Sequence, residues 1–133
     1  MTAAQAATLV QQFEQCSLPK EAWTHEAHFI MAFWYCMQHP VCKATEMISE
    51  GIKKYNLSVG GSNTDTSGYH ETITLFYSST VCNYIICNRI NSINDDSIKA
   101  LLAQSFIKKD YLNHFYTKEQ IDSVSARKHW EKP

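Results

Sequence analysis

Residues 24–38 read THEAHFIMAFWYCMQ, and this stretch decides the fold. Nine consecutive apolar residues, Phe29 to Met37, lie within it, fewer than half of the roughly twenty that a membrane-spanning helix needs. Thr24 carries the hydroxyl group that suits a helix N-cap, and Pro40 stops the helix after about Gln38. Because apolar residues cover nearly every side of such a helix, the stretch predicts a buried helix surrounded by others.

A second apolar segment, residues 72–90, predicts the other central helix. It is interrupted by Ser, Thr, Asn and Tyr, and its length without Gly or Pro favours one helix from Tyr69 to about Asn91, capped by Thr66 or Ser67. The same segment is rich in β-branched residues, which leaves open an alternative in which part of Ile73–Ile90 forms strands.

Helical spacing of apolar residues recurs along the rest of the chain, whereas strand alternation is weak. Further helices are expected over residues 2–15, 41–56, 94–104 and 109–116, and from the capping box at Thr117–Gln120 to about Lys128. Residues 57–68 are rich in Asn, Asp, Ser, Thr and Gly and predict a long loop. The sequence therefore predicts an all-α fold, a single helical domain over 1–133 with five to seven helices around two central hydrophobic ones. Phe33 and Tyr77, midway along those two helices, are expected to be largely buried.

Composition restricts the classes of partner. The chain has 133 residues, of which 44% are hydrophobic, enough for one sizeable core. Twelve basic and thirteen acidic residues give a net charge of −1, so neither nucleic acid nor a membrane is an expected partner. The first ten residues, MTAAQAATLV, lack the features of a signal peptide. Five cysteines without a CxxC pair predict reduced cysteines, with Cys36, Cys82 and Cys87 in the core, and hence a cytoplasmic protein.

Histidines open both central helices. His25 and His28 share one face of the first, because residues three apart on a helix are neighbours, and His70 with Glu71 begins the second. If the two helix N-termini lie together, His25, His28 and His70 could bind a divalent metal such as Zn and leave a coordination position for water. Glu26 or Glu71 would then be a fourth ligand or would orient an imidazole.

A metal-free pocket is the second interpretation of the same polar residues. His70 and Glu71 are then the candidate catalytic acid and base, acting on a small polar molecule. The candidate ligand-binding residues are Trp23, Thr24, Asn63, Asp65, Tyr69 and Tyr77.

A purely structural role is the third interpretation. The spacing H-E-A-H is not the H-E-x-x-H of metalloproteases, and H-x-x-H is common by chance. In this alternative the protein is a non-catalytic interaction or structural protein, and His70 anchors the loop over residues 57–68 through Asn63, Asp65 or Thr66.

Three motifs together resemble a family of small, uncharacterised bacterial proteins: W-T-H-E-A-H-F at 23–29, N-T-D-T-S-G-Y-H-E-T-I-T at 63–74, and the tail F-Y-T-K-E-Q-I…S-A-R-K-H-W at 115–130. The resemblance spans most of the chain. It implies a bacterial cytosolic source and a single domain, and no activity. Its hallmark positions here are Trp23, Thr24, His25, His28, Asn63, Thr64, Gly68, Tyr69, His70, Glu71 and Thr72.

Overall fold

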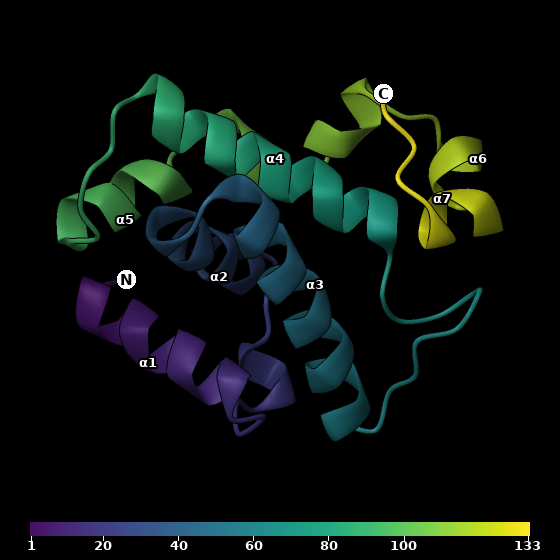
Figure 1. The fold of residues 1–133 in the computed structure, drawn as a ribbon, viewed down its shortest axis with the longest axis horizontal. Coiled ribbons are helices and arrows are strands. Elements are labelled where there is room, and N and C mark those ends of the chain that lie inside the picture. The colour runs from purple at the N-terminus through teal and green to yellow at the C-terminus, as the bar shows by residue number, and fades with distance from the viewer.

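The computed structural model describes residues 1–133 and contains helices and no strands, which confirms the all-α prediction (Figure 1). The α-helices are α1 (Ala3–Glu14), α2 (His25–Gln38), α3 (Val41–Ser58), α4 (Glu71–Cys87), α5 (Asp95–Leu102), α6 (Lys118–Ile121) and α7 (Val124–Lys128). Three short 3₁₀ helices are η1 (Lys20–Ala22), η2 (Ser105–Ile107) and η3 (Tyr111–His114).

Helix α2 lies at the centre of the bundle and packs against α1, α3, α4 and α5 (Figure 1). Its hydroxyl cap forms as predicted, because Thr24 Oγ1 accepts a hydrogen bond from the Ala27 N–H. Half of its fourteen residues are buried, including Phe33 at 0% exposure, which fits a helix with no polar side.

Helix α4 packs across α2 and α3 and is shorter at both ends than predicted. Its N-cap is His70, whose Nδ1 accepts a hydrogen bond from the Ile73 N–H at 3.2 Å, so the predicted cap at Thr66 or Ser67 is wrong. The chain stays in a loop until His70 because Gly68 has a φ of +82°, a left-handed conformation that helices do not contain. No part of residues 73–90 forms a strand: α4 continues through Cys87 with its own helical hydrogen bonds, and a turn follows it.

The two amphipathic helices α1 and α3 cover one side of α2. The Phe13 ring lies against Gly51 of α3, where an added Cβ would come within 2.8 Å of the ring. Tyr55, fully buried, donates its hydroxyl hydrogen to the Leu18 carbonyl at 2.9 Å. A single hydrophobic cluster of 20 buried residues joins these helices with α2, α4, α5 and η2, as expected of one domain.

The C-terminal segment folds back on the beginning of α4 (Figure 1). Thr72, fully buried, donates its hydroxyl hydrogen to the His129 carbonyl at 2.8 Å and accepts the Glu131 N–H at 3.0 Å. The capping box at Thr117 and Gln120 forms as predicted and opens α6. These contacts hold α6 and α7 beside the N-terminus of α4.

The cysteines differ from the prediction. Cys36 of α2 and Cys82 of α4 form a disulfide, with their Cα atoms 5.6 Å apart, so the prediction of reduced cysteines is wrong for this pair. Cys16, Cys42 and Cys87 are free, and Cys87 is exposed where burial was expected. The disulfide joins the two central helices because these positions face each other across their contact, which spacing along the sequence does not reveal.

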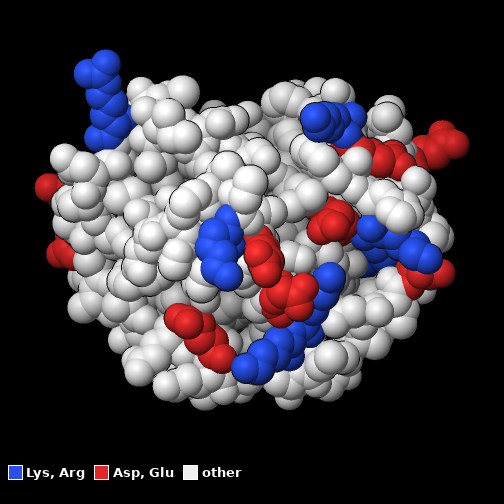
Figure 2. Space-filling view, viewed as in Figure 1, with Lys and Arg blue, Asp and Glu red and all other residues white.

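No helix combines the length and the apolar character that crossing a membrane requires. Figure 2 shows lysine and arginine interspersed with aspartate and glutamate over α3. The charges on this face therefore form no large patch of one sign.

Candidate pocket between helices α2, α3 and α4

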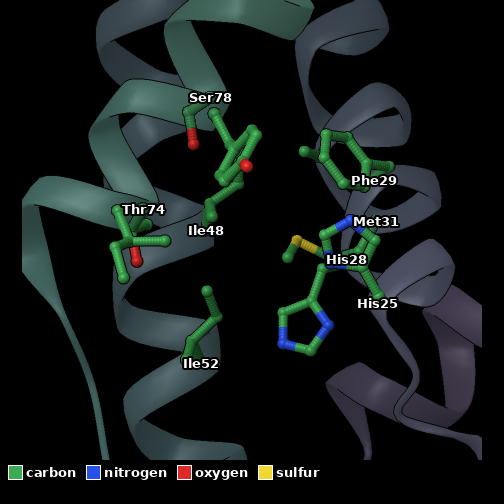
Figure 3. A pocket seen from close by; sticks show the side chains of 11 residues that line it. His25, His28, Phe29, Met31, Ile48, Ile52, Thr74 and Ser78 are labelled. Atoms are coloured by element: carbon green, nitrogen blue, oxygen red, sulfur yellow. The ribbon is translucent and has the colours of Figure 1, made fainter. Parts of the chain in front are cut away.

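A cavity of about 230 Å³ lies where α2, α3 and α4 meet (Figure 3). It is lined by His25, His28, Phe29, Met31, Ala32, Ile48, Ile52, Ile73, Thr74, Tyr77 and Ser78. Seven of these eleven residues are hydrophobic, and none has a carboxylate, ammonium or guanidinium group. The pocket is therefore an apolar space with a few uncharged polar groups, the usual character of a small-molecule site.

His25 enters this space from the first turn of α2. Its Nε2 donates a hydrogen bond to the Ile107 carbonyl of η2 at 2.7 Å, since a carbonyl oxygen can only accept. The ring also packs edge-on against Phe29 and Tyr77, with centroids 5.0 and 6.4 Å apart. The proton on Nε2 leaves Nδ1 of the neutral ring as a hydrogen-bond acceptor.

His28 lies one turn further along α2, and Figure 3 shows its ring opposite Ile52 of α3. Its Nδ1 donates to the Thr24 carbonyl at 2.7 Å, and the ring stacks on Trp23 with centroids 3.9 Å apart. Burial lowers the pKa of His28 below its ordinary value of 6.5, against the opposing effect of the Thr24 hydrogen bond, and nearby His25 lowers this pKa further. His28 is therefore neutral at pH 7, with Nε2 as the acceptor.

Helix α4 supplies the hydroxyl groups of the pocket. Thr74 and Ser78 face the histidines across the cavity (Figure 3), and Tyr77 packs edge-on against Phe29 with centroids 5.0 Å apart. Burial raises the pKa of Tyr77 above its ordinary value, so the phenol keeps its proton. Tyr77 is partly buried where it was expected to be largely buried, because one side of its ring borders the cavity.

His70 does not line this pocket. Its Nδ1 caps α4, and its Nε2 donates to the Ile121 carbonyl at the end of α6 at 2.6 Å, so both ring nitrogens are engaged. Burial is the main cause that lowers the pKa of His70. The lowered pKa keeps the ring in the neutral form that capping requires. No group of three His, Cys, Asp or Glu side chains is placed to hold a metal ion. The predicted centre of His25, His28 and His70 is therefore not formed.

The other predicted site residues form hydrogen bonds and stacking contacts outside the pocket. Tyr69 is buried and donates its hydroxyl hydrogen to Glu71 Oε1 at 2.6 Å. Burial is the larger cause that raises the pKa of Tyr69, and this hydrogen bond is the next. Thr24 caps α2, and Trp23 stacks between His28 and Phe13 outside the cavity. These residues shape the surroundings of the pocket but do not line it.

The long loop is held by its own residues, by α3 and by α7, and not by His70. Asn63 Oδ1 accepts the Tyr69 N–H at 3.1 Å, and Asn63 Nδ2 donates to the Lys53 carbonyl at 3.0 Å. Arg127 Nη1 donates to the Gly68 carbonyl at 2.9 Å, and the exposed Asp65 pairs with a lysine of α7. Asn63 and Asp65 thus have structural partners in this loop.

Sequence reasoning missed the contribution of α3. Ile48 and Ile52 of α3 form one side of the pocket, and nothing in the spacing of apolar residues along that helix distinguishes them from residues that only pack in the core. Met31 and Ser78 were also missed, since nothing in the spacing within one helix shows which residues of its apolar surface border a cavity.

Comparison of the chain with protein-family models, with curated proteins and with solved structures finds no match.

Proposed function

We propose that this protein binds one small, largely apolar molecule in the pocket between α2, α3 and α4. A single observation carries the proposal: a cavity of about 230 Å³ is lined by apolar side chains from three helices together with two oriented imidazoles. Apolar lining with a few placed polar groups is how proteins bind small molecules, the apolar surface supplying affinity and the polar groups orientation.

The proposed activity is binding, and His70 and Glu71 are not part of it. Both nitrogens of His70 are engaged in holding α4 and α6 together, and Glu71 accepts from Tyr69. In the pocket itself, the N–H groups of His25 and His28 are donated to backbone carbonyls, which fixes the orientation of the two rings. Both imidazoles thus have a fixed orientation and one nitrogen that is free to accept a hydrogen bond, which suits them to recognising a ligand.

The proposal also includes a cytoplasmic location and membership of the bacterial family that the three sequence motifs resemble. Cys36 and Cys82 provide the test of location, because disulfides are rare in a reducing cytoplasm. The disulfide of the structure therefore counts against this location, and alkylation of thiols at the moment of cell lysis, followed by mass spectrometry, would support it only by finding the pair reduced and modified. An unmodified disulfide in freshly trapped protein would argue for an oxidising compartment.

Benzene is a suitable probe of the pocket, because apolar cavities of about 150 Å³ already accept it. We expect benzene to move the amide and methyl NMR signals of pocket residues and few others. Ile52→Trp, which fills the cavity, should abolish these changes. Ile86→Trp is the matched control, since Ile86 lies on α4 away from the pocket and is 69% exposed. If wild-type signals do not move, or move equally in Ile52→Trp, the proposed function is wrong.

A further inference from the structure

The two imidazoles of the pocket have the same kind of free atom. His25 donates from Nε2 to Ile107, and His28 donates from Nδ1 to Thr24, so in the neutral tautomer that each bond selects, the other ring nitrogen carries a lone pair and no N–H. Two different nitrogens are used, yet the chemical result is identical. The histidines therefore recognise a hydrogen-bond donor and cannot donate to an acceptor.

The orientation of His28 is fixed by a hydrogen bond and by ring stacking. Its bond to the Thr24 carbonyl is 2.7 Å long, and its ring is stacked on Trp23, which itself stacks on Phe13 with centroids 4.8 Å apart. A flip of the ring would place a carbon atom against the carbonyl and lose that bond. Nε2 is thus held toward the cavity, on the side of Ile52 in Figure 3.

The pocket is also unsuited to an anionic ligand. No lysine or arginine lines it, and a carboxylate moved there from water would lose its hydration without gaining an ion pair. The lowered pKa of His28 acts in the same direction, because an uncharged imidazole gives a carboxylate neither a charge nor a second N–H. A neutral ligand meets no such cost.

The size of the cavity limits the ligand further. A cavity of about 150 Å³ holds benzene, with six non-hydrogen atoms. In proportion, the cavity of about 230 Å³ holds a molecule of roughly nine or ten non-hydrogen atoms. This is the size of a bicyclic aromatic compound or a substituted single ring.

Resting on the proposed function, we propose that the ligand is a neutral molecule with an apolar ring body and one N–H or O–H donor, which it directs to Nε2 of His28. The body fills the space among Phe29, Ile48 and Ile52. Thr74 and Ser78, which lie across the cavity from the histidines in Figure 3, border a second edge of the ligand.

Indole and benzofuran test this inference, because both have nine non-hydrogen atoms and differ in the donor: indole has an N–H where benzofuran has an oxygen. Dissociation constants from NMR titration should favour indole by about fivefold, the typical net effect of one hydrogen bond. His28→Phe keeps a ring to stack on Trp23 and removes the acceptor, so indole and benzofuran should then bind equally. His114→Phe is the control, because His114 is exposed and outside the pocket, and it should keep the preference. Benzoate should bind most weakly.

The possible results separate the inference from the proposed function. If indole and benzofuran bind equally to wild type, or if benzoate binds best, the inference is wrong while the pocket remains a binding site. Loss of the preference in His25→Phe but not in His28→Phe would overturn the assignment to His28. Failure of indole, benzofuran and benzene alike would overturn the proposed function itself. Should His28→Phe not fold, long-range ¹H–¹⁵N spectra of wild type decide instead: the Nε2 signal of His28 should shift with indole and not with benzofuran, and no shift with indole refutes the inference.

Discussion

Replacing His70 tests the role that the structure gives this residue. His70→Ala removes the acceptor for the Ile73 N–H, and the loss of an N-cap costs about 1 kcal/mol. It also leaves the Ile121 carbonyl without its donor, which costs about 1–2 kcal/mol for a partly buried group. The free energy of unfolding should therefore fall by about 2–3 kcal/mol in urea denaturation.

His70→Asn separates the two contributions. Asparagine is a good N-cap, but its side chain is too short to reach Ile121 as the imidazole does. This variant should recover about 1 kcal/mol of the loss. Because the bond to Ile121 ties α6 to α4, amide hydrogen exchange should accelerate over residues 118–128 in both variants, and much less over residues 57–68. A loss below about 0.5 kcal/mol in His70→Ala, or faster exchange confined to the loop, would refute this account of His70.

Four further outcomes are expected. Phe33→Ala should lower the free energy of unfolding by about 3–5 kcal/mol, because Phe33 is fully buried, and a loss under about 1 kcal/mol would contradict its central position. Gly68→Ala should lower the free energy of unfolding by about 2 kcal/mol or more, since the added Cβ would lie 1.8 Å from a backbone oxygen. Gly60→Ala is the control: Gly60 has a similar φ but open space around it, so this variant should lose less. Burial lowers the pKa of both His28 and His70 in the folded chain, so on acidification the unfolded chain takes up these protons first. The free energy of unfolding in urea should therefore fall as the pH drops below about 6.5 and stay level above it. A free energy of unfolding that does not change from about pH 7.5 to about 5.5 would disprove this. Reducing the disulfide between α2 and α4, whose cysteines are 46 residues apart, should lower stability by up to about 4 kcal/mol, and an unchanged urea midpoint after reduction would contradict its contribution.

The helices were predictable where local chemistry sets their ends. Thr24 and Thr117 cap helices in the structure as the sequence indicates, because a threonine hydroxyl reaches the free N–H groups of the first turn wherever it precedes a helix. The start of α4 was not predictable in this way. Its cap is a histidine, an unusual capping residue, and His70 is held in place by Ile121, 51 residues away.

The candidate site was predictable on one helix and not between helices. His25 and His28 head an apolar face of α2, and both line the pocket, because positions three apart on one helix share a face in any fold. Whether His70 joins them depends on how α4 crosses α2, and the spacing within either helix contains no such information. The disulfide between the two helices was missed for the same reason.

The disulfide and the exposed loop after α3 together determine what a break in the backbone would do. A protease cut among residues 60–68, which are nearly all exposed, would divide the chain into one fragment with α1 to α3 and another with α4 to α7. Cys36 belongs to the first fragment and Cys82 to the second, so the fragments would stay covalently joined and would separate on a gel only after reduction. All three sides of the pocket would remain tethered in the nicked protein. The loop is therefore the place where the chain can be opened, or a new segment inserted, with the least consequence for the pocket.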